Sequence, residues 1–483
     1  MALDEIRKTK LEKLEKLKKA GIDPYPSVSG RTHTIAQALE NFDKFSESKE
    51  ELTLAGRVMA RRDMGGAIFF DLRDDSGKIQ GFIKEDIVGK EIFSNFSDLT
   101  DIGDFIEISG TLFKTKKEEK TLEVKDFKIL TKALLPLPEK WHGLQDTEER
   151  LRKRYLDFIF NPESRQIVEK RAIFWNAVRE FHVKNGFLEV ETPVLETTVG
   201  GADATPFKTH HDALDIDVYL RISAGELWQK RLMVAGFEKT FEIGRIFRNE
   251  GMSAEHLQDY TQCEAYWAYA NYEDMYKFLK ECYRYVAEKT FGTLQFKING
   301  FDINLGTDWP LIDYTEEIRK QTNIDIWKAS DEDIKNKLES LKVDYDTKNR
   351  ARLIDSLWKY CRKNIGGPAI LINEPKIISP LAKASSKNPD ITERFHFIIA
   401  GSEVGQGYSE LNDPIDQRER FEIQEKMRKL GDQEAQMADY DFIEALEYGM
   451  PPTAGHGFSE RLFSFLMDKP VRETQIFPLM KNR

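Results

Sequence analysis

Hydrophobic and polar residues alternate in two segments rich in aromatic side chains, FEIGRIF at 241–247 and YTQCEAYWAY at 260–269. This alternation predicts two β-strands, and the polar residues between them predict a long hairpin connection. Connections of that length are uncommon unless they have a function. Because successive side chains of a strand point to opposite faces, Glu264 shares a face with Tyr266, while Cys263 lies on the other. An ordinary sheet with one solvated face has the same alternation, but arginine, carboxylates and phenols together predict an organised anionic site.

The first 25 residues are predicted to form a basic helix. Leucine and isoleucine recur at helical spacing among lysines, and Gly21 and Pro24 end the pattern. Such a helix is either an ordinary solvated helix or a basic arm that meets a phosphate backbone.

Short alternating segments between residues 52 and 130, separated by turns such as DDSGK, predict a small β-barrel with an insert at 84–100. An OB-fold fits the number of strands, and such barrels offer aromatic platforms to single-stranded nucleic acid. We assign residues 26–135 to this domain. Residues 136–150 have little pattern and are predicted to be a linker.

The remaining residues, 151–483, mix helical and strand patterns. Helices are predicted at 151–160, at 163–186 with Gly186 at the end, and at 224–236. The segment FLEVETPVLE, which follows the second helix, predicts a strand that ends at Pro193. Residues 270–380 are mostly helical in pattern, with a helical insertion at roughly 310–370.

Length and composition narrow the classes of protein. The chain of 483 residues is too long for one ordinary core, so two or three domains are expected. A net charge of −11 is not typical of a general nucleic-acid binder, although segregated basic residues still allow RNA binding. Three cysteines without a C-x-x-C pair argue against a disulfide framework or a cysteine-rich zinc site. Without a signal peptide or long apolar run, a cytoplasmic protein with no membrane partner is expected.

The segment FRNEG at 247–251, followed by CEAYWAY, resembles motif 2 of class II aminoacyl-tRNA synthetases in its lysyl-tRNA synthetase version (subclass b). The helix and strand at 163–196 resemble motif 1, GMPPTAGHGFSERLFSF resembles motif 3, and the similarity covers nearly the whole chain. The resemblance implies an α+β fold: an N-terminal OB-fold barrel, then a class II catalytic domain with a central antiparallel sheet flanked by helices. It also implies a homodimer formed through motif 1.

The family's ATP-binding residues fall on five positions of motifs 2 and 3. The resemblance implies that Arg248 holds the α-phosphate and the substrate carboxylate. It places Glu250 and His256 at the triphosphate and adenine, and Tyr260 as the ring that stacks on adenine. Arg461 would stack on the other side and meet the γ-phosphate, so that Arg248 and Arg461 are the catalytic arginines.

The amino-acid pocket is implied by a second group of positions. They are Gly201, Glu226, Glu264, Tyr266, Gln406, Tyr408 and Glu410. An ammonium ligand needs an anionic partner in a partly dry pocket, which Glu264 and Glu410 would supply, while Glu226 would engage the α-amino group. The segment Ser-Ala-Gly before Glu226 is one residue longer than the family pattern.

The metal site departs from the family pattern. Glu403 falls on the carboxylate that holds Mg²⁺ between the ATP phosphates, but His396 stands where the family has its second acidic ligand. Mg²⁺ prefers oxygen ligands, so His396 acts through water or one metal is held differently.

In the barrel, the resemblance implies contacts with the anticodon of tRNA(Lys). Phe69 would stack on the central uridine, Gln80 would read its edge, and Arg61 would lie near the backbone. Phe69 and its neighbour Phe70 must point in opposite directions, so one of them belongs to the core of the barrel.

The combined prediction is a lysine–tRNA ligase that uses ATP with Mg²⁺. An aspartyl- or asparaginyl-type synthetase shares the architecture, but its pocket would present an arginine or lysine to the side chain. A ligase that lysylates a protein would lack the barrel. The third alternative is a non-catalytic RNA-binding paralogue, which His396 and the shortened glycine pattern HGFSER leave open.

Overall fold

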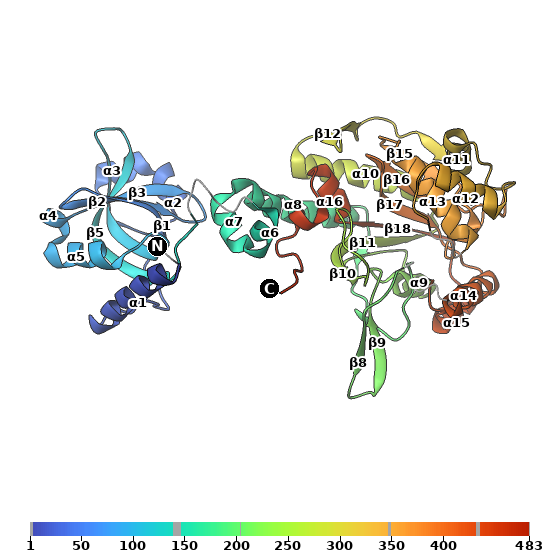
Figure 1. Cartoon of the computed structure of the whole chain (residues 1–483), viewed down its shortest axis with the longest axis horizontal. Coiled ribbons are helices and arrows are strands. Elements are labelled where there is room, and N and C mark those ends of the chain that lie inside the picture. Colours follow the sequence, from blue (N-terminus) through green and yellow to red (C-terminus); the bar gives the residue numbers. More distant parts are fainter. Residues whose placement is uncertain (1–2, 139–145, 203, 346–348, 431–434, 483) are drawn as a thin grey trace. The chain divides into compact units, whose positions relative to one another are not determined.

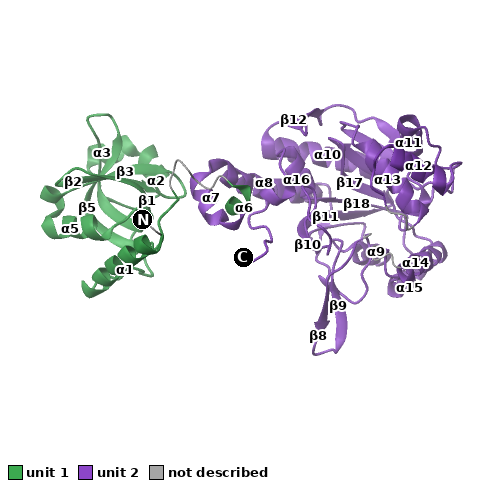
Figure 2. Cartoon of the chain, viewed as in Figure 1, with its two compact units in different colours: residues 1–150 green, residues 151–483 purple. Residues whose placement is uncertain are grey.

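The computed structural model describes residues 3–138, 146–202, 204–345, 349–430 and 435–482. The chain divides into two compact units, residues 1–150 and 151–483 (Figures 1 and 2). No helix in these described ranges is long and apolar enough to cross a membrane.

Unit 1 is built on a closed barrel with the strand order β1-β2-β3-β5-β4, which confirms the predicted OB-fold. The strands are β1 (Leu52–Asp63), β2 (Ala67–Arg73), β3 (Lys78–Lys84), β4 (Phe105–Lys114) and β5 (Lys120–Thr131). Alternate residues of every strand fill the barrel. The helices are α1 (Leu3–Lys19), α2 (Ile35–Glu40), α3 (Phe42–Ser48), α4 (Glu85–Val88) and α5 (Lys90–Leu99), and the last two form the predicted insert.

The basic helix α1 docks on the barrel by one face. Leu17 is buried against Leu99 and Ile129, and the Lys13 ammonium lies 2.6 Å from the Asp101 carboxylate. Most of the other lysines of α1 are exposed, so the helix is anchored and still presents positive charge to solvent.

Unit 2 is organised around an eight-stranded sheet with the order β14-β15-β16-β17-β18-β11-β10-β6. Its strands are β6 (Leu188–Glu189), β10 (Lys239–Phe247), β11 (Asp259–Ala268), β14 (Leu311–Asp313), β15 (Ala369–Ile372), β16 (Arg394–Ile399), β17 (Ser402–Ser409) and β18 (Thr453–Ser459). Only the outermost pairs, β10 with β6 and β14 with β15, are parallel. The central sheet is therefore antiparallel, as predicted.

Helices cover both faces of this sheet (Figure 1). The long helices α8 (Pro162–Lys184) and α10 (Tyr272–Phe291) pack on one face around Phe241, Cys263 and Ala265. On the other face α9 (Glu226–Val234), α14 (Pro414–Lys429) and α15 (Tyr440–Glu447) form a smaller core with Tyr266 and Tyr408. The polar face of the sheet therefore has a wall of helices at one end and remains open elsewhere.

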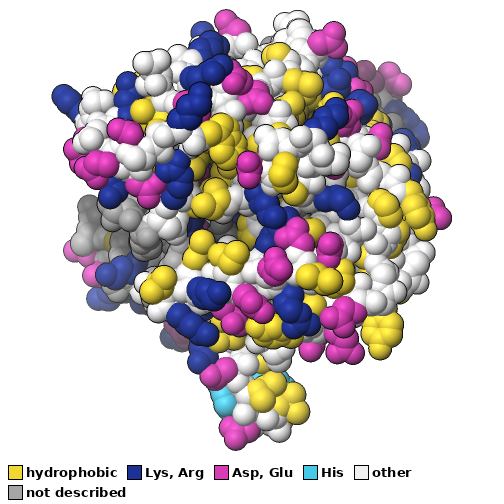
Figure 3. All heavy atoms as spheres, turned by 90° about the vertical axis from the view of Figure 1, so that its right-hand side faces the viewer, with side chains coloured by type: hydrophobic (Ala, Val, Ile, Leu, Met, Phe, Trp, Pro, Cys, Tyr) yellow, Lys and Arg dark blue, Asp and Glu magenta, His cyan; other side chains and the backbone are white. Residues whose placement is uncertain are grey.

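The other elements of unit 2 extend this framework. They are α6 (Thr147–Arg152, which begins in unit 1), α7 (Arg154–Phe160), β7 (Leu195–Glu196), β8 (Lys208–His211), β9 (Ile216–Leu220), β12 (Gln295–Ile298), β13 (Phe301–Asn304), α11 (Tyr314–Thr322), α12 (Asp331–Ser340), α13 (Arg350–Arg362), α16 (Arg461–Leu466) and the 3-10 turns η1 (Lys376–Ile378) and η2 (Val471–Thr474). The β8–β9 hairpin projects away from the rest of the unit (Figure 1), and the face seen in Figure 3 intersperses acidic and basic side chains.

Three predicted elements differ in detail. The segment 187–196 forms only β6 and β7, two residues each, which pair with β10 and with β9 in different sheets; Pro193, which has no N–H, lies between them. The helix predicted at 151–160 is broken at Lys153 into α6 and α7. The insertion at 310–370 contains strands at its ends, β14 and β15, which complete the edge of the large sheet.

Candidate active site

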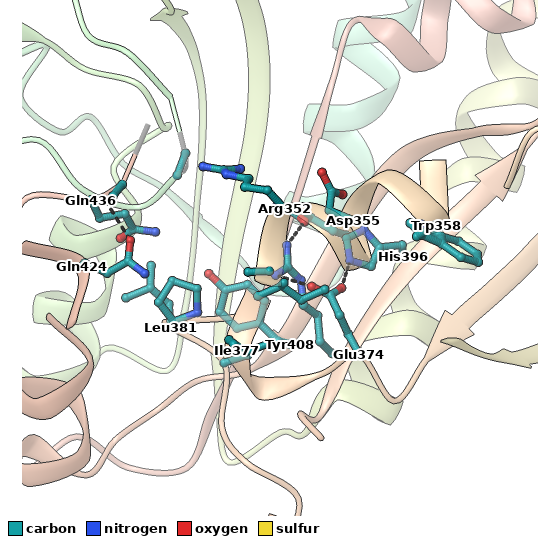
Figure 4. A pocket seen from close by; sticks show the side chains of 18 of the residues that line it. Arg352, Asp355, Trp358, Glu374, Ile377, Leu381, His396, Tyr408, Gln424 and Gln436 are labelled. Atoms are coloured by element: carbon teal, nitrogen blue, oxygen red, sulfur yellow. Dashed lines mark hydrogen bonds and ion pairs between the residues drawn. The ribbon is translucent and has the colours of Figure 1, made fainter. Parts of the chain in front are cut away.

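Two adjoining cavities of about 270 and 230 Å³ lie on the polar face of the sheet in unit 2. The first is lined by α13, η1, β16 and β17, and the second by the 248–258 connection and the end of β18. Arg248, His396, Glu403 and Gln406 line both. Figure 4 shows the first cavity, with His396 and Tyr408 among its labelled lining residues. The predicted motif 2 residues and the predicted carboxylate strand thus meet in one place.

The hairpin of β10 and β11 forms with the register Phe241–Ala265 and Glu242–Glu264. After β10 ends, the Arg248 N–H donates to the Gln258 carbonyl at 2.7 Å, and its Nε donates to the Ile222 carbonyl at 3.3 Å. The guanidinium lies 5.7 Å from the centre of the Tyr260 ring. Arg248 is therefore held beside the two cavities that it lines.

Close backbone packing forms one wall of the predicted amino-acid pocket. Gly201 has a φ of 90°, and a Cβ there would lie 2.7 Å from Ser223 Oγ and 2.8 Å from Glu226 Cβ. Gly225, with a φ of 76°, turns the chain into α9, which Glu226 begins. The additional residue of the Ser-Ala-Gly segment is thus accommodated by a left-handed glycine, and the Ala224 N–H donates to Glu264 Oε1 at 2.9 Å.

Three carboxylates are buried in this pocket: Glu226, Glu264 and Glu410. Burial, and then the charge of Glu226, raise the pKa of Glu264 to about 8, while the Tyr266 hydroxyl donates to it at 3.2 Å. Burial also raises the pKa of Glu410 to about 8. The Tyr408 hydroxyl donates to Glu226. Carboxyl groups that are this dry favour a cationic ligand, because a nearby positive charge stabilises their ionised forms.

The ammonium of Lys230, on α9, lies 2.7 Å from Glu226 Oε1 and 2.5 Å from Glu410 Oε2. Lys230 lies outside motifs 1, 2 and 3, and it was not among the predicted site residues. The i, i+4 spacing from Glu226 on a predicted helix was the signal that could have found it.

Glu403 and Arg461 meet across the second cavity. The Trp358 indole N–H donates to Glu403 Oε1 at 2.5 Å, and Arg461 Nη1 donates to the Glu403 carbonyl at 3.1 Å. Burial works to raise the pKa of Glu403, but His396, Arg362 and the indole N–H outweigh it, and its pKa lies below the usual value. Arg461 also pairs with Glu255 of the hairpin connection.

Comparisons with known proteins agree with this geometry. The family described as tRNA synthetases class II (D, K and N) matches residues 146–481, and an OB-fold nucleic acid binding domain matches 52–130. Lysine–tRNA ligases of Thermotoga maritima and Carboxydothermus hydrogenoformans are each 44% identical over 100% of this chain, which covers 97% and 99% of their lengths. The chain belongs to the class II lysine–tRNA ligases.

In the barrel of this synthetase, Phe69 and Phe70 separate as expected. Phe70 is buried in the barrel core, whereas Phe69 lies on the outer face, 4.6 Å from the ring of Phe82. Gln80 lies on the neighbouring strand and accepts a hydrogen bond from Thr121 Oγ1 at 3.0 Å.

Arg61 is not brought together with these two residues. It pairs across the ladder with Phe70, while Arg62 pairs with Phe69. Its guanidinium donates to the Thr100 carbonyl at 2.9 Å and to Asp63. The side chain of Arg61 thus ties β1 to the end of α5, and Arg62 is the arginine beside the outer aromatic.

His396, at the predicted metal position, is engaged by a carboxylate. His396 Nε2 faces the carboxylate of Glu374, and its Nδ1 lies 3.7 Å from Glu403 Oε2 (Figure 4). Arg394 lies 3.1 Å from the same Glu374. Burial works to raise the pKa of Glu374, but Arg394 and His396 lower it to about 2. A carboxylate placed at 396 would therefore face an ionised carboxylate.

Among the described residues no group of three or more histidine, cysteine, aspartate or glutamate side chains could hold a metal ion. Mg²⁺ at a nucleotide site is typically held by one or two carboxylates together with phosphates and waters. Glu403, which is ionised and lines both cavities, fits such a role, whereas His396 is already engaged by Glu374.

Glu374, Trp358 and Glu255 were missed along with Lys230. Glu374 precedes a loop, Trp358 belongs to a helix with an ordinary amphipathic pattern, and Glu255 lies in the irregular hairpin connection. No periodicity connects these three positions in sequence, because only the tertiary fold brings them to Glu403, His396 and Arg461.

Proposed function

We propose that this chain activates L-lysine with ATP and joins it to tRNA(Lys). The observation that carries the proposal is the set of buried carboxylates, Glu226, Glu264 and Glu410. Glu226 contacts Gly201 and Tyr408, which line the first cavity together with Arg248. A substrate with an acidic side chain would be repelled there, and an amide would leave carboxylates without a cationic partner. These groups favour lysine over aspartate or asparagine. The two adjoining cavities, lined by Arg248 and Glu403, favour an enzyme over a non-catalytic RNA-binding paralogue.

In the first step a carboxylate oxygen of lysine attacks the α-phosphorus of ATP. The bond from the α-phosphorus to the bridging oxygen breaks, and pyrophosphate leaves with that electron pair. Arg248 would hold the lysine carboxylate and the α-phosphate together, while Glu250, His256 and Tyr260 would hold the triphosphate and adenine. Most of the rate enhancement would come from positioning and charge neutralisation.

Arg461 would neutralise the γ-phosphate from the opposite end. Glu403 would hold Mg²⁺, which, when bound with ATP, would neutralise charge on the phosphates. His396, fixed by Glu374, lies at the edge of this position and would act through water. Gly201, Tyr266, Gln406 and Tyr408 would line the site that binds lysine.

In the second step a ribose hydroxyl of the terminal nucleotide of tRNA attacks the carbonyl carbon of lysyl-adenylate. An ester bond forms, and AMP leaves. Phe69 and Gln80, on the outer face of the barrel, would stack on and read an anticodon base. The structure favours Arg62 over Arg61 as the arginine next to that base.

We further propose a homodimer formed through the motif 1 region. Exposed apolar side chains gather on α8, β6 and the segment after it: Ile173, Val183, Leu188, Val194 and Leu195. Large apolar side chains left exposed on neighbouring segments of the motif 1 region are candidates for burial between two subunits. The proposed reaction places the protein in the cytoplasm, where it would charge tRNA.

Aminoacylation with radiolabelled lysine tests the overall proposal. We expect lysine to become acid-precipitable with tRNA(Lys) as acceptor and ATP present, and to be released by mild base, as an ester is. Activation of lysine without any transfer to tRNA would reject the tRNA half of the proposal.

A further inference from the structure

Lys230 is the most enclosed cation of the amino-acid pocket. Its side chain is 1% exposed, and its ammonium touches Glu226 and Glu410, whose side chains are 6% and 1% exposed. The rings of Tyr408 and Tyr266 lie 5.4 and 6.0 Å from the same nitrogen, with Phe442 at 6.0 Å. Aromatic faces and two carboxylates thus surround the charge on several sides.

The proposed substrate brings its own charges to this pocket. Lysine carries two ammonium groups and one carboxylate, and Arg248 would meet the carboxylate. The pocket holds three carboxylates, Glu226, Glu264 and Glu410, against one ammonium, that of Lys230. With all three carboxyl groups ionised in the lysine-bound state, the sum leaves two negative charges for the two positive charges of the substrate. Without Lys230 the buried site would keep one uncompensated carboxylate, which is costly in a dry environment.

We propose that Lys230 is a positioning residue for the amino-acid substrate. It pairs with Glu226 and Glu410 and fixes both carboxyl groups in direction, and so sets the pocket to accept a substrate with two cationic groups. This inference rests on the proposed lysine activation. Lys230 does not touch the reacting atoms, and its effect is transmitted through the two carboxylates that it joins.

Lys230→Met tests the inference because methionine keeps an unbranched side chain of similar length without the charge. We expect the KM for lysine in ATP–pyrophosphate exchange to rise about 10- to 100-fold, the range for loss of a hydrogen bond to a charged group. The KM for ATP should stay within about twofold of the wild type. A lysine KM within about twofold of the wild type would overturn the inference, as would equal rises for lysine and ATP.

Lys132→Met is the matched control. Lys132 is also fully buried between two carboxylates, with its ammonium 2.5 Å from Asp101 and 2.7 Å from Asp104, but it belongs to the barrel. The Lys132→Met variant loses the same kind of ion pair, and its KM for lysine should equal that of the wild type. A similar rise in both variants would assign the effect to general destabilisation and would overturn the inference.

A second variant separates position from folding. In Lys230→Ala, methylammonium chloride should restore part of the lysine-dependent exchange in a saturable manner, and sodium chloride at equal concentration should not. If Lys230→Met fails to fold, Lys230→Ala purified with methylammonium replaces it. If Lys230→Ala loses lysine binding when methylammonium is removed, the result supports the inference. If the variant still binds lysine without methylammonium, the result overturns it. Wild-type protein without lysine-dependent exchange would instead reject the proposed function itself.

Discussion

Arg461 is held by a carboxylate of its own chain. Glu255, from the connection between β10 and β11, pairs with its guanidinium and also accepts from Ser402 Oγ at 2.6 Å. The same guanidinium is proposed to meet the terminal phosphate of ATP. A carboxylate and a phosphate cannot use the same donors at once, so ATP must displace Glu255.

Glu255→Gln should therefore lower the KM for ATP. The pair is partly exposed, with side chains 17% and 35% accessible, so we expect a modest effect of about two- to fivefold. Steady-state exchange at varied ATP concentration measures it. The exposed Glu419 on α14 supplies the control, Glu419→Gln, which should leave the ATP dependence unchanged; an unchanged or higher KM in Glu255→Gln would contradict the displacement.

The raised pKa values of Glu264 and Glu410, about 8 each, predict a proton linkage. At pH 7 these carboxyl groups hold protons that the arrival of an ammonium group would expel. Lysine binding should release protons at pH 7, and its affinity should increase as pH rises from 7 towards 8.5. Isothermal titration calorimetry in phosphate and in Tris measures the release from the difference in apparent enthalpy. Glu264→Gln should reduce it; proton uptake by the wild type would contradict the prediction.

At the scale of elements, one pair of histidines joins α8 to β18. The Nε2 atoms of His182 and His456 are 3.1 Å apart in the core under the sheet, between the rings of Phe241 and Phe278. His456 belongs to the motif 3 segment GHGFSER, whose departure from the family pattern thus has a structural partner on α8. Burial lowers the pKa of His182 to about 4 and that of His456 well below its usual value.

This pair predicts a specific loss of stability in acid. Between pH 6.5 and 4 the unfolded chain binds a proton at His182 that the folded chain excludes, so stability falls as pH falls through that window. At pH 5 the loss from His182 is about 2 kcal/mol. Urea unfolding at pH 7 and pH 5 measures it, and the double variant His182→Phe/His456→Leu should show a smaller difference. Equal pH dependence in both proteins would contradict the assignment.

The large elements could be predicted from sequence because each is specified locally. The β10–β11 hairpin follows from its alternation, and α1 and α8 follow from their helical spacing and end residues. Phe69 and Phe70 could be assigned to opposite faces but not to inside or outside, because that choice depends on the closure of the barrel. Glu374 and Lys230 show the limit more clearly. The partners of Glu374 and one partner of Lys230, Glu410, lie on other elements, and a pattern along the chain contains no information about which elements meet.

At the scale of the whole molecule, the two units have separate proposed tasks. Unit 1 carries the outer aromatic face of the barrel, and unit 2 carries both cavities. Damage to nucleic-acid recognition should therefore leave amino-acid activation intact.

Phe69→Ala and Gln80→Ala should weaken tRNA charging while lysine-dependent exchange stays unchanged. The loss of one base–aromatic stack costs about 1–3 kcal/mol of binding. Phe70→Ala is the contrasting variant, because this buried ring is part of the barrel core and its removal should lower the melting temperature. If Phe69→Ala lowers the melting temperature as much as Phe70→Ala does, Phe69 has a structural role, and its assignment as the ring that stacks on an anticodon base is wrong.

The measurement that tests the central claim most directly is ATP–pyrophosphate exchange with each of the standard amino acids in turn, at equal concentration and without tRNA. Lysine should support rapid exchange, because its two ammonium groups can meet Glu226, Glu264 and Glu410 together, which the neutral and acidic amino acids cannot do. A site built for such a group can reject substrates lacking it by about 10⁴-fold or more. Faster exchange with aspartate or asparagine than with lysine, or no exchange with any amino acid, would contradict the claim.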